Sequence, residues 1–130
     1  MGTPGAKKGD HVVGIDMHVV MVSTPSGQVP TPTLMPFKAE LSDGLSSTVF
    51  IDNEPAAVKG STGVNDPEHQ AVGGSFQEEP SNKAEIEKGS ATVFFGEKEA
   101  ARQGDPALTC NDPEAAPKGT VMAEGTVIIG

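Results

Sequence analysis

The sequence predicts a mainly-β fold built from three similar β-hairpins. The chain has 16 glycines and 11 prolines among its 130 residues, a content that indicates short strands joined by tight turns. It also contains an internal repeat, because residues 47–61 align without gaps on residues 91–105 at a constant offset of 44. Each copy consists of a short apolar strand, a tight turn, a second strand and a glycine followed by a small polar residue. This pattern is typical of a hairpin.

The second strand of the second copy, residues 98–102, is made of residues that by themselves favour a helix. The aligned segment of the first copy begins with Pro55 and contains Val58, and both residues favour an extended chain. We therefore predict strands in both copies.

The two ends of the chain each supply half of a third copy. Residues 125–130 match the first half of the repeat, and residues 6–10 match the second half. If the C-terminal strand pairs with the N-terminal strand, three hairpins close into a ring with pseudo-threefold symmetry. Closure would also remove free sheet edges.

A further pattern precedes the first strand of each copy. An apolar residue lies three places before a glycine, in the pairs Leu41 and Gly44, Ile86 and Gly89, and Met122 and Gly125. Glycine at such a position suits a turn that needs positive φ.

Length and composition favour one globular domain spanning residues 1–130. The net charge of −9, with 9 basic against 18 acidic residues, excludes the basic surface that nucleic-acid binding needs. No apolar stretch approaches the roughly 20 residues of a membrane-spanning helix, and the N-terminus lacks a signal-peptide pattern. We therefore expect a protein made in the cytoplasm that is not a stable membrane protein.

The histidines and the single cysteine form one candidate set of metal ligands: His11, His18, His69 and Cys110. His18 and His69 each follow the end of a repeat by eight residues, and Cys110 follows the third repeat end by five. Three imidazoles and a thiolate complete a closed tetrahedral shell for zinc, and such a shell is structural. Binding would contribute directly to the free energy of folding. The alternatives are solvated histidines and a buried, inert cysteine.

His11 needs a further condition to join this set. It lies seven residues from His18, so an unbroken strand would place the two side chains on opposite faces. A bulge between them, for example at Gly14, would bring both to one metal ion.

Residues 54–60 and 99–105 resemble the Pro-Ala-Ala-Arg signature that names the PAAR-repeat proteins, and the apolar strands before them resemble the same family. Neither copy spells the signature in full, because Val58 replaces its arginine and Glu99 replaces its proline. The long segment between His18 and Leu41 is similar to that of extended, PAAR-like members of the family.

The resemblance implies a compact, conical PAAR-type domain with a metal ion, zinc or iron, bound near its sharp end by histidine and cysteine. Its wide base would sit on a trimeric VgrG-like or phage-spike-like β-helical protein, with one tip per trimer. The implied role is non-enzymatic: the tip sharpens the spike, which pierces a target envelope when a sheath contracts.

The same resemblance implies a location and further partners. The protein would be part of an injection particle, exported or extracellular on firing, with transient piercing of a membrane and a toxin cargo as further expectations. Type VI secretion, extracellular contractile injection and phage-tail-like particles all fit.

Only five aromatic side chains are available to anchor the base: Phe37, Phe50, Phe76, Phe94 and Phe95. Two other classes of function stay open on the residues alone. One is a small zinc-dependent hydrolase with Glu68, beside His69, as general base, although the sequence has no His-Glu-x-x-His motif. The other is a metal-free acidic adaptor module.

Overall fold

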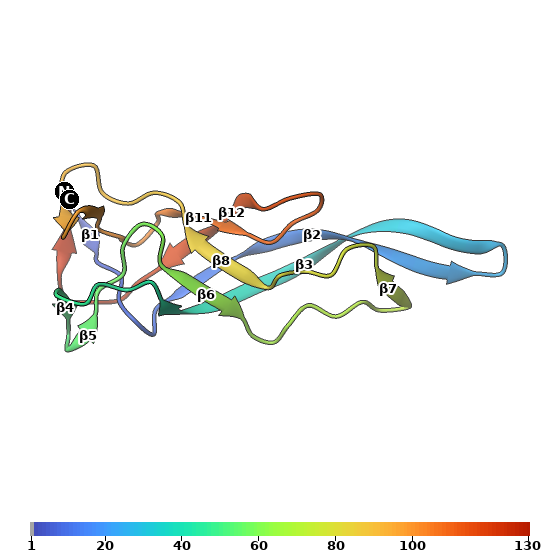
Figure 1. Cartoon of the computed structure of the whole chain (residues 1–130), viewed down its shortest axis with the longest axis horizontal. Coiled ribbons are helices and arrows are strands. Elements are labelled where there is room, and N and C mark those ends of the chain that lie inside the picture. The colour runs from blue at the N-terminus through green and yellow to red at the C-terminus, as the bar shows by residue number, and fades with distance from the viewer. Residues whose placement is uncertain (1) are drawn as a thin grey trace.

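Short hairpins at one end of the molecule and one long hairpin at the other define its shape (Figure 1). The computed structural model describes residues 2–130, and these contain strands and no helix. The mainly-β fold class predicted from the sequence is therefore confirmed. The strands are β1 (Thr3–Pro4), β2 (His11–Thr24), β3 (Gly27–Asp43), β4 (Phe50–Ile51), β5 (Glu54–Pro55), β6 (Thr62–Asn65), β7 (Gly74–Phe76), β8 (Lys83–Ile86), β9 (Phe94–Phe95), β10 (Lys98–Glu99), β11 (Pro106–Thr109), β12 (Ala116–Met122) and β13 (Ile128–Ile129).

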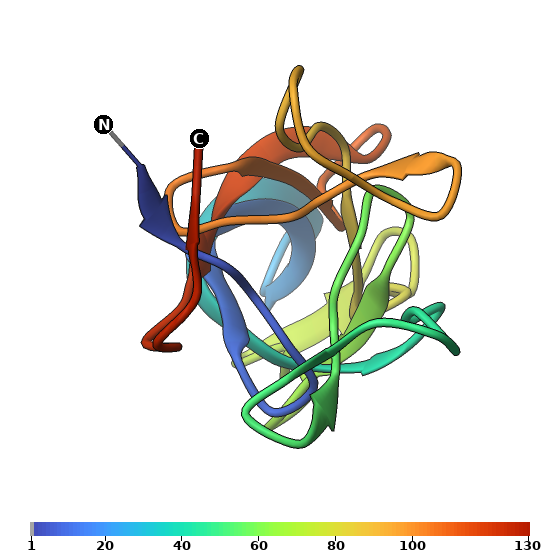
Figure 2. The ribbon, with the colours of Figure 1, turned by 90° about the vertical axis from the view of Figure 1, so that its left-hand side faces the viewer.

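Three two-stranded hairpins form the base of the molecule. They are β4–β5, β9–β10 and β1–β13, all antiparallel. They share one register, in the pairs Phe50 with Pro55, Phe94 with Glu99, and Ile128 with Pro4. The third copy is thus assembled from the two chain ends, as the sequence predicts. Figure 2 looks onto this base, where the N- and C-terminal segments lie side by side.

Backbone hydrogen bonds close the three hairpins into a ring. The N–H of Ala6 donates to the carbonyl of Ala101 (2.9 Å), that of Ala57 to Ala6 (2.9 Å), and that of Ala101 to Ala57 (3.1 Å). All three alanines are 0% exposed. Because three backbones meet here, a larger side chain would push them apart. The alanines of the repeated signature are therefore explained by packing around the pseudo-threefold axis.

A left-handed glycine ends the second strand of each copy. Gly9, Gly60 and Gly104 have φ values of 94°, 92° and 90°. Their N–H groups donate to the carbonyls of Leu41, Ile86 and Val121 respectively. The third apolar residue of the upstream pattern is therefore Val121, which is buried, and the sequence alignment on Met122 was one residue too late.

Six strands form a closed sheet behind the base. The order is β12-β11-β8-β6-β3-β2, and β12 also pairs with β2, which removes the free edges at the closure. Its interior is filled by a cluster of buried side chains that includes Val12, Phe37, Leu41 and Ile86. Among residues 2–130 there is no helix long and apolar enough to span a membrane.

The long hairpin β2–β3 extends away from the base beyond every other element (Figure 1). Its pairing runs without a register shift from His11 with Glu40 to Thr24 with Gly27. Side chains of β2 alternate between the two faces, so that Val12, Asp16 and His18 are buried. This alternation brings polar side chains into the interior where the hairpin leaves the closed sheet.

Candidate metal centre

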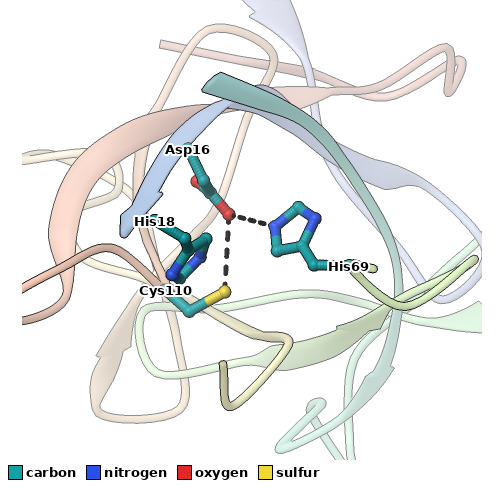
Figure 3. Close-up of side chains that lie close together, drawn as sticks. All are labelled: Asp16, His18, His69 and Cys110. Carbon is teal, nitrogen blue, oxygen red and sulfur yellow. Dashed lines mark hydrogen bonds and ion pairs between the residues drawn. The ribbon is translucent and has the colours of Figure 1, made fainter. Parts of the chain in front are cut away.

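Four buried side chains meet inside the molecule near the root of the long hairpin (Figure 3). They are Asp16, His18, His69 and Cys110, and one ligand atom from each lies within 4.8 Å of the others. Asp16 and His18 are two residues apart on β2 and therefore share its inner face. His69 lies in the loop after β6, and Cys110 directly follows β11. Three distant parts of the chain are thus joined at one point.

The structure brings together three of the four residues that the sequence selected, namely His18, His69 and Cys110. His11 lies elsewhere. It pairs with Glu40 and Met122 at the start of β2, and the ladder from there to His18 contains no bulge. Seven residues at about 3.3 Å each separate the two histidines by about 23 Å. The condition set for His11 is therefore not met.

Asp16 is the residue that sequence reasoning missed. Its carboxylate is 0% exposed and accepts hydrogen bonds from Thr109 Oγ1 and from His69 Nε2 at 2.8 Å. Longer contacts of 3.4 Å come from Cys110 Sγ and Asn111 Nδ2. The only local signal was its spacing, because a residue two places before His18 in a strand must share its face.

His18 points an unpartnered nitrogen into the cluster. Its Nδ1 lies 3.3 Å from Asp112 Oδ1, and the other oxygen of Asp112 accepts the backbone N–H of Val19 at 2.8 Å. This carboxylate favours a proton on Nδ1 and leaves the lone pair on Nε2. Nε2 is buried and has no hydrogen-bond partner among residues 2–130. An orphaned buried acceptor is the feature that a bound cation would satisfy.

Two asparagines fix the ring of His69. Asn82 Oδ1 accepts the backbone N–H of His69 (3.0 Å) and the amide of Asn65 (3.1 Å). Asn65 Nδ2 then faces His69 Nδ1 at 3.3 Å, while Nε2 faces Asp16. In this arrangement Nε2 carries the ring proton. Ligation through Nε2 therefore requires that proton to leave and Asp16 to exchange its hydrogen bond for a metal contact.

Cys110 is a neutral thiol in this environment. Burial raises its pKa to about 11, and the charge of Asp16 adds to the shift. A metal ion would reverse this preference, since a coordinating thiol is deprotonated. Two nitrogens, a sulfur and an oxygen fit a tetrahedral zinc shell, and imidazole also suits iron. A pocket lined by His18, Cys110 and Asp112 offers a path from the surface.

Comparison with protein-family models matches residues 1–107 to the PAAR motif. The chain belongs to the PAAR-motif family. A search of curated proteins finds no match. The matched residues include Asp16, His18 and His69. Cys110 and residues 125–130, which supply the first half of the third repeat, follow the matched segment. The PAAR motif is associated with the spike tip of contractile injection systems, which is a structural role.

Glu68, which the sequence analysis considered as a hydrolytic base, is not a member of the four-residue cluster. Glu68 is exposed and lines a different pocket with Glu40 and Asp66. Its neighbour His69 is buried and belongs to the cluster. Glu68 is therefore not placed to activate a water at the four-residue site.

Proposed function

We propose that residues 1–130 act as one unit that caps the end of a trimeric VgrG-like or phage-spike-like β-helical protein, with one tip per trimer. The observation that supports this most is the repetition of an exposed apolar side chain on the base. Phe50, Phe94 and Ile128 occupy equivalent positions in the three hairpins and are 56%, 52% and 60% exposed. A single chain thereby offers three similar contacts to three identical subunits.

The other phenylalanines are less suited to anchor a partner on the base. Phe37 is 2% exposed inside the closed sheet, and Phe76 packs edge-on to His18 with ring centroids 5.9 Å apart. Phe95 follows Phe94 in β9 and is less exposed than Phe94, because it is half-buried. Of the five aromatic residues, Phe50 and Phe94 therefore form the proposed contact, and Ile128 completes it by symmetry.

The four-residue cluster supports the second part of the proposal, a zinc or iron ion bound by Asp16, His18, His69 and Cys110. Bound there, the ion would supply structural links rather than chemistry, because four protein ligands leave no open position. It would join β2, the loop after β6 and the segment after β11. Fixing three segments at one point suits a part that transmits force when a sheath contracts and the spike pierces an envelope.

The test measures two properties of the complex with a trimeric spike: its stoichiometry, and the dependence of its affinity on the exposed phenylalanines of the base. Native mass spectrometry should give one copy of this chain per three spike chains, together with the mass of one metal ion. Phe50→Ser with Phe94→Ser should weaken the complex at least about tenfold, since buried aromatic anchors dominate interface energies. Val72→Ser, at a residue 84% exposed away from the base hairpins, is the matched control. A 3:3 complex, or equal affinity of both variants, contradicts the proposal.

Metal analysis separates this function from the alternatives. One tightly bound ion without hydrolytic activity supports the tip. Protein purified without any metal, and unable to take up zinc, would favour the acidic adaptor module.

A further inference from the structure

The β2–β3 hairpin has a feature that neither the base nor the metal centre uses. Residues 17–37 contain no Asp, Glu, Lys or Arg, in a chain whose net charge is −9. This segment forms the part of the hairpin that extends beyond the closed sheet (Figure 1). The most protruding part of an acidic protein is thus free of charge.

One face of this hairpin is apolar over four consecutive cross-strand pairs, between Val13 with Lys38 at one end and Ser23 with Gln28 at the other. Its cross-strand pairs are Ile15 with Pro36, Met17 with Leu34, Val19 with Pro32, and Met21 with Pro30. We call these eight residues the apolar ribbon. Leu34 is 72% exposed and Ile15 54%, and the prolines are also exposed. Contiguous exposed apolar surface of this kind marks a site of interaction.

The two edges of the hairpin present few free backbone donors. On the β2 edge, Asn111 Oδ1 accepts the N–H of Met17 and Asp112 Oδ2 that of Val19, each at 2.8 Å. The neighbouring residues 20–22 pair with β7. These contacts satisfy β2 on the side away from β3.

On the β3 edge, proline removes three backbone donors, while the N–H of Leu34, at a position of the same kind, remains. The N–H of Lys38 points away from β2 and donates to Asn65 Oδ1 at 2.9 Å. By the alternation of an antiparallel ladder, Pro30, Pro32 and Pro36 occupy positions of the same kind. Their side of β3 would otherwise expose three further N–H groups, and each unsatisfied group is costly in hydrocarbon.

We propose that the apolar ribbon enters the hydrocarbon of a lipid bilayer. Three observations together favour lipid over a protein partner: the absence of charged residues between residues 17 and 37, the apolar face of four consecutive cross-strand pairs, and the removal of three backbone donors from the open edge. The ribbon from Ile15 with Pro36 to Met21 with Pro30 spans about 20 Å at 3.3 Å per residue, which lies between the roughly 15 Å of one leaflet and the roughly 30 Å of the whole hydrocarbon core. The hairpin is therefore long enough to enter one leaflet and too short to cross both.

A tryptophan probe tests the proposal, because the chain contains no tryptophan. Leu34→Trp places the probe on the ribbon, and Val64→Trp places it at a 52% exposed position on β6 as the matched control. With phosphatidylcholine vesicles, the emission of Leu34→Trp should shift to shorter wavelength and be quenched by brominated acyl chains. Val64→Trp should show neither effect. Leu34→Glu should lower the partition coefficient, measured by vesicle sedimentation, at least about tenfold.

Each other outcome overturns the proposal. Unchanged emission of Leu34→Trp excludes lipid contact, and equal quenching of both probes indicates non-specific adsorption. A concentration-dependent dimer in which the Leu34→Trp emission shifts without lipid would show that a second copy covers the ribbon.

The setting of this inference rests on the proposed function, since a spike tip meets an envelope. The two can nevertheless fail separately. Vesicle binding needs no spike, and the Leu34→Glu variant should still form the 1:3 complex because Leu34 pairs with Met17 on the long hairpin and belongs to none of the three base hairpins.

Discussion

The ring of alanines at the pseudo-threefold axis gives the sharpest prediction for stability. Ala6, Ala57 and Ala101 are each 0% exposed and exchange backbone hydrogen bonds in a cycle of 2.9, 2.9 and 3.1 Å. Ala57→Val adds two methyl groups where three backbones meet. Valine has high β propensity, so any loss of stability must come from packing rather than from the strand conformation.

Overpacking of a filled interior costs about 1–3 kcal/mol of unfolding free energy. For a chain of this size, that corresponds to a decrease in Tm of roughly 4–12 °C. Differential scanning calorimetry of the metal-loaded protein measures this change. The symmetry adds a stricter requirement: Ala6→Val and Ala101→Val should lower Tm by similar amounts, because the three sites have the same environment.

The control is Ala91→Val, at an exposed position in the second repeat. It should change the unfolding free energy by no more than about 0.5 kcal/mol. If Ala57→Val is as stable as this control, the ring is not tightly packed. If only one of the three ring variants is destabilised, the pseudo-threefold packing argument is wrong.

Two further predictions concern the cluster and the hairpin edge. Cys110→Ser and His18→Ala should each lower zinc affinity by more than about 100-fold and lower Tm, whereas His11→Ala should retain the metal because His11 lies about 23 Å away along β2. Metal titration and calorimetry measure both quantities, and metal loss in His11→Ala would contradict the site described above. Pro30→Thr with Pro32→Thr restores two backbone donors on the open edge of β3 and should cause concentration-dependent self-association in sedimentation velocity. Pro25→Thr, in the turn of the hairpin, is the control and should stay at the monomer mass. If the double variant also stays at the monomer mass, the prolines do not protect the edge.

Much of the base could be predicted because its signals are local and occur more than once. A hairpin is specified by a short apolar strand, a turn and a glycine, and the gapless match of residues 47–61 to residues 91–105 repeats all three. The halves at the two chain ends were recognisable for the same reason. The error at Met122 arose where the third copy departs from this spacing by one residue.

The candidate site was only partly predictable. His18, His69 and Cys110 stand out because histidine and cysteine are rare in the chain, whereas Asp16 is one of 18 acidic residues and has no such contrast. His11 was selected for its residue type, although its place depended on the continuity of β2. Which phenylalanines are exposed on the base was likewise undetermined until the register of each hairpin was known.

The sequence by itself determined the repeat, the closure of its third copy by the chain ends, and the absence of charge between residues 17 and 37. Only the tertiary structure decided which side chains share an interior point and which form one exposed face. The reason is physical: hairpin and turn preferences act between neighbouring residues. The meeting of Asp16, His69 and Cys110, or of Met17 and Leu34, depends on the strand register that packing of the whole closed sheet selects.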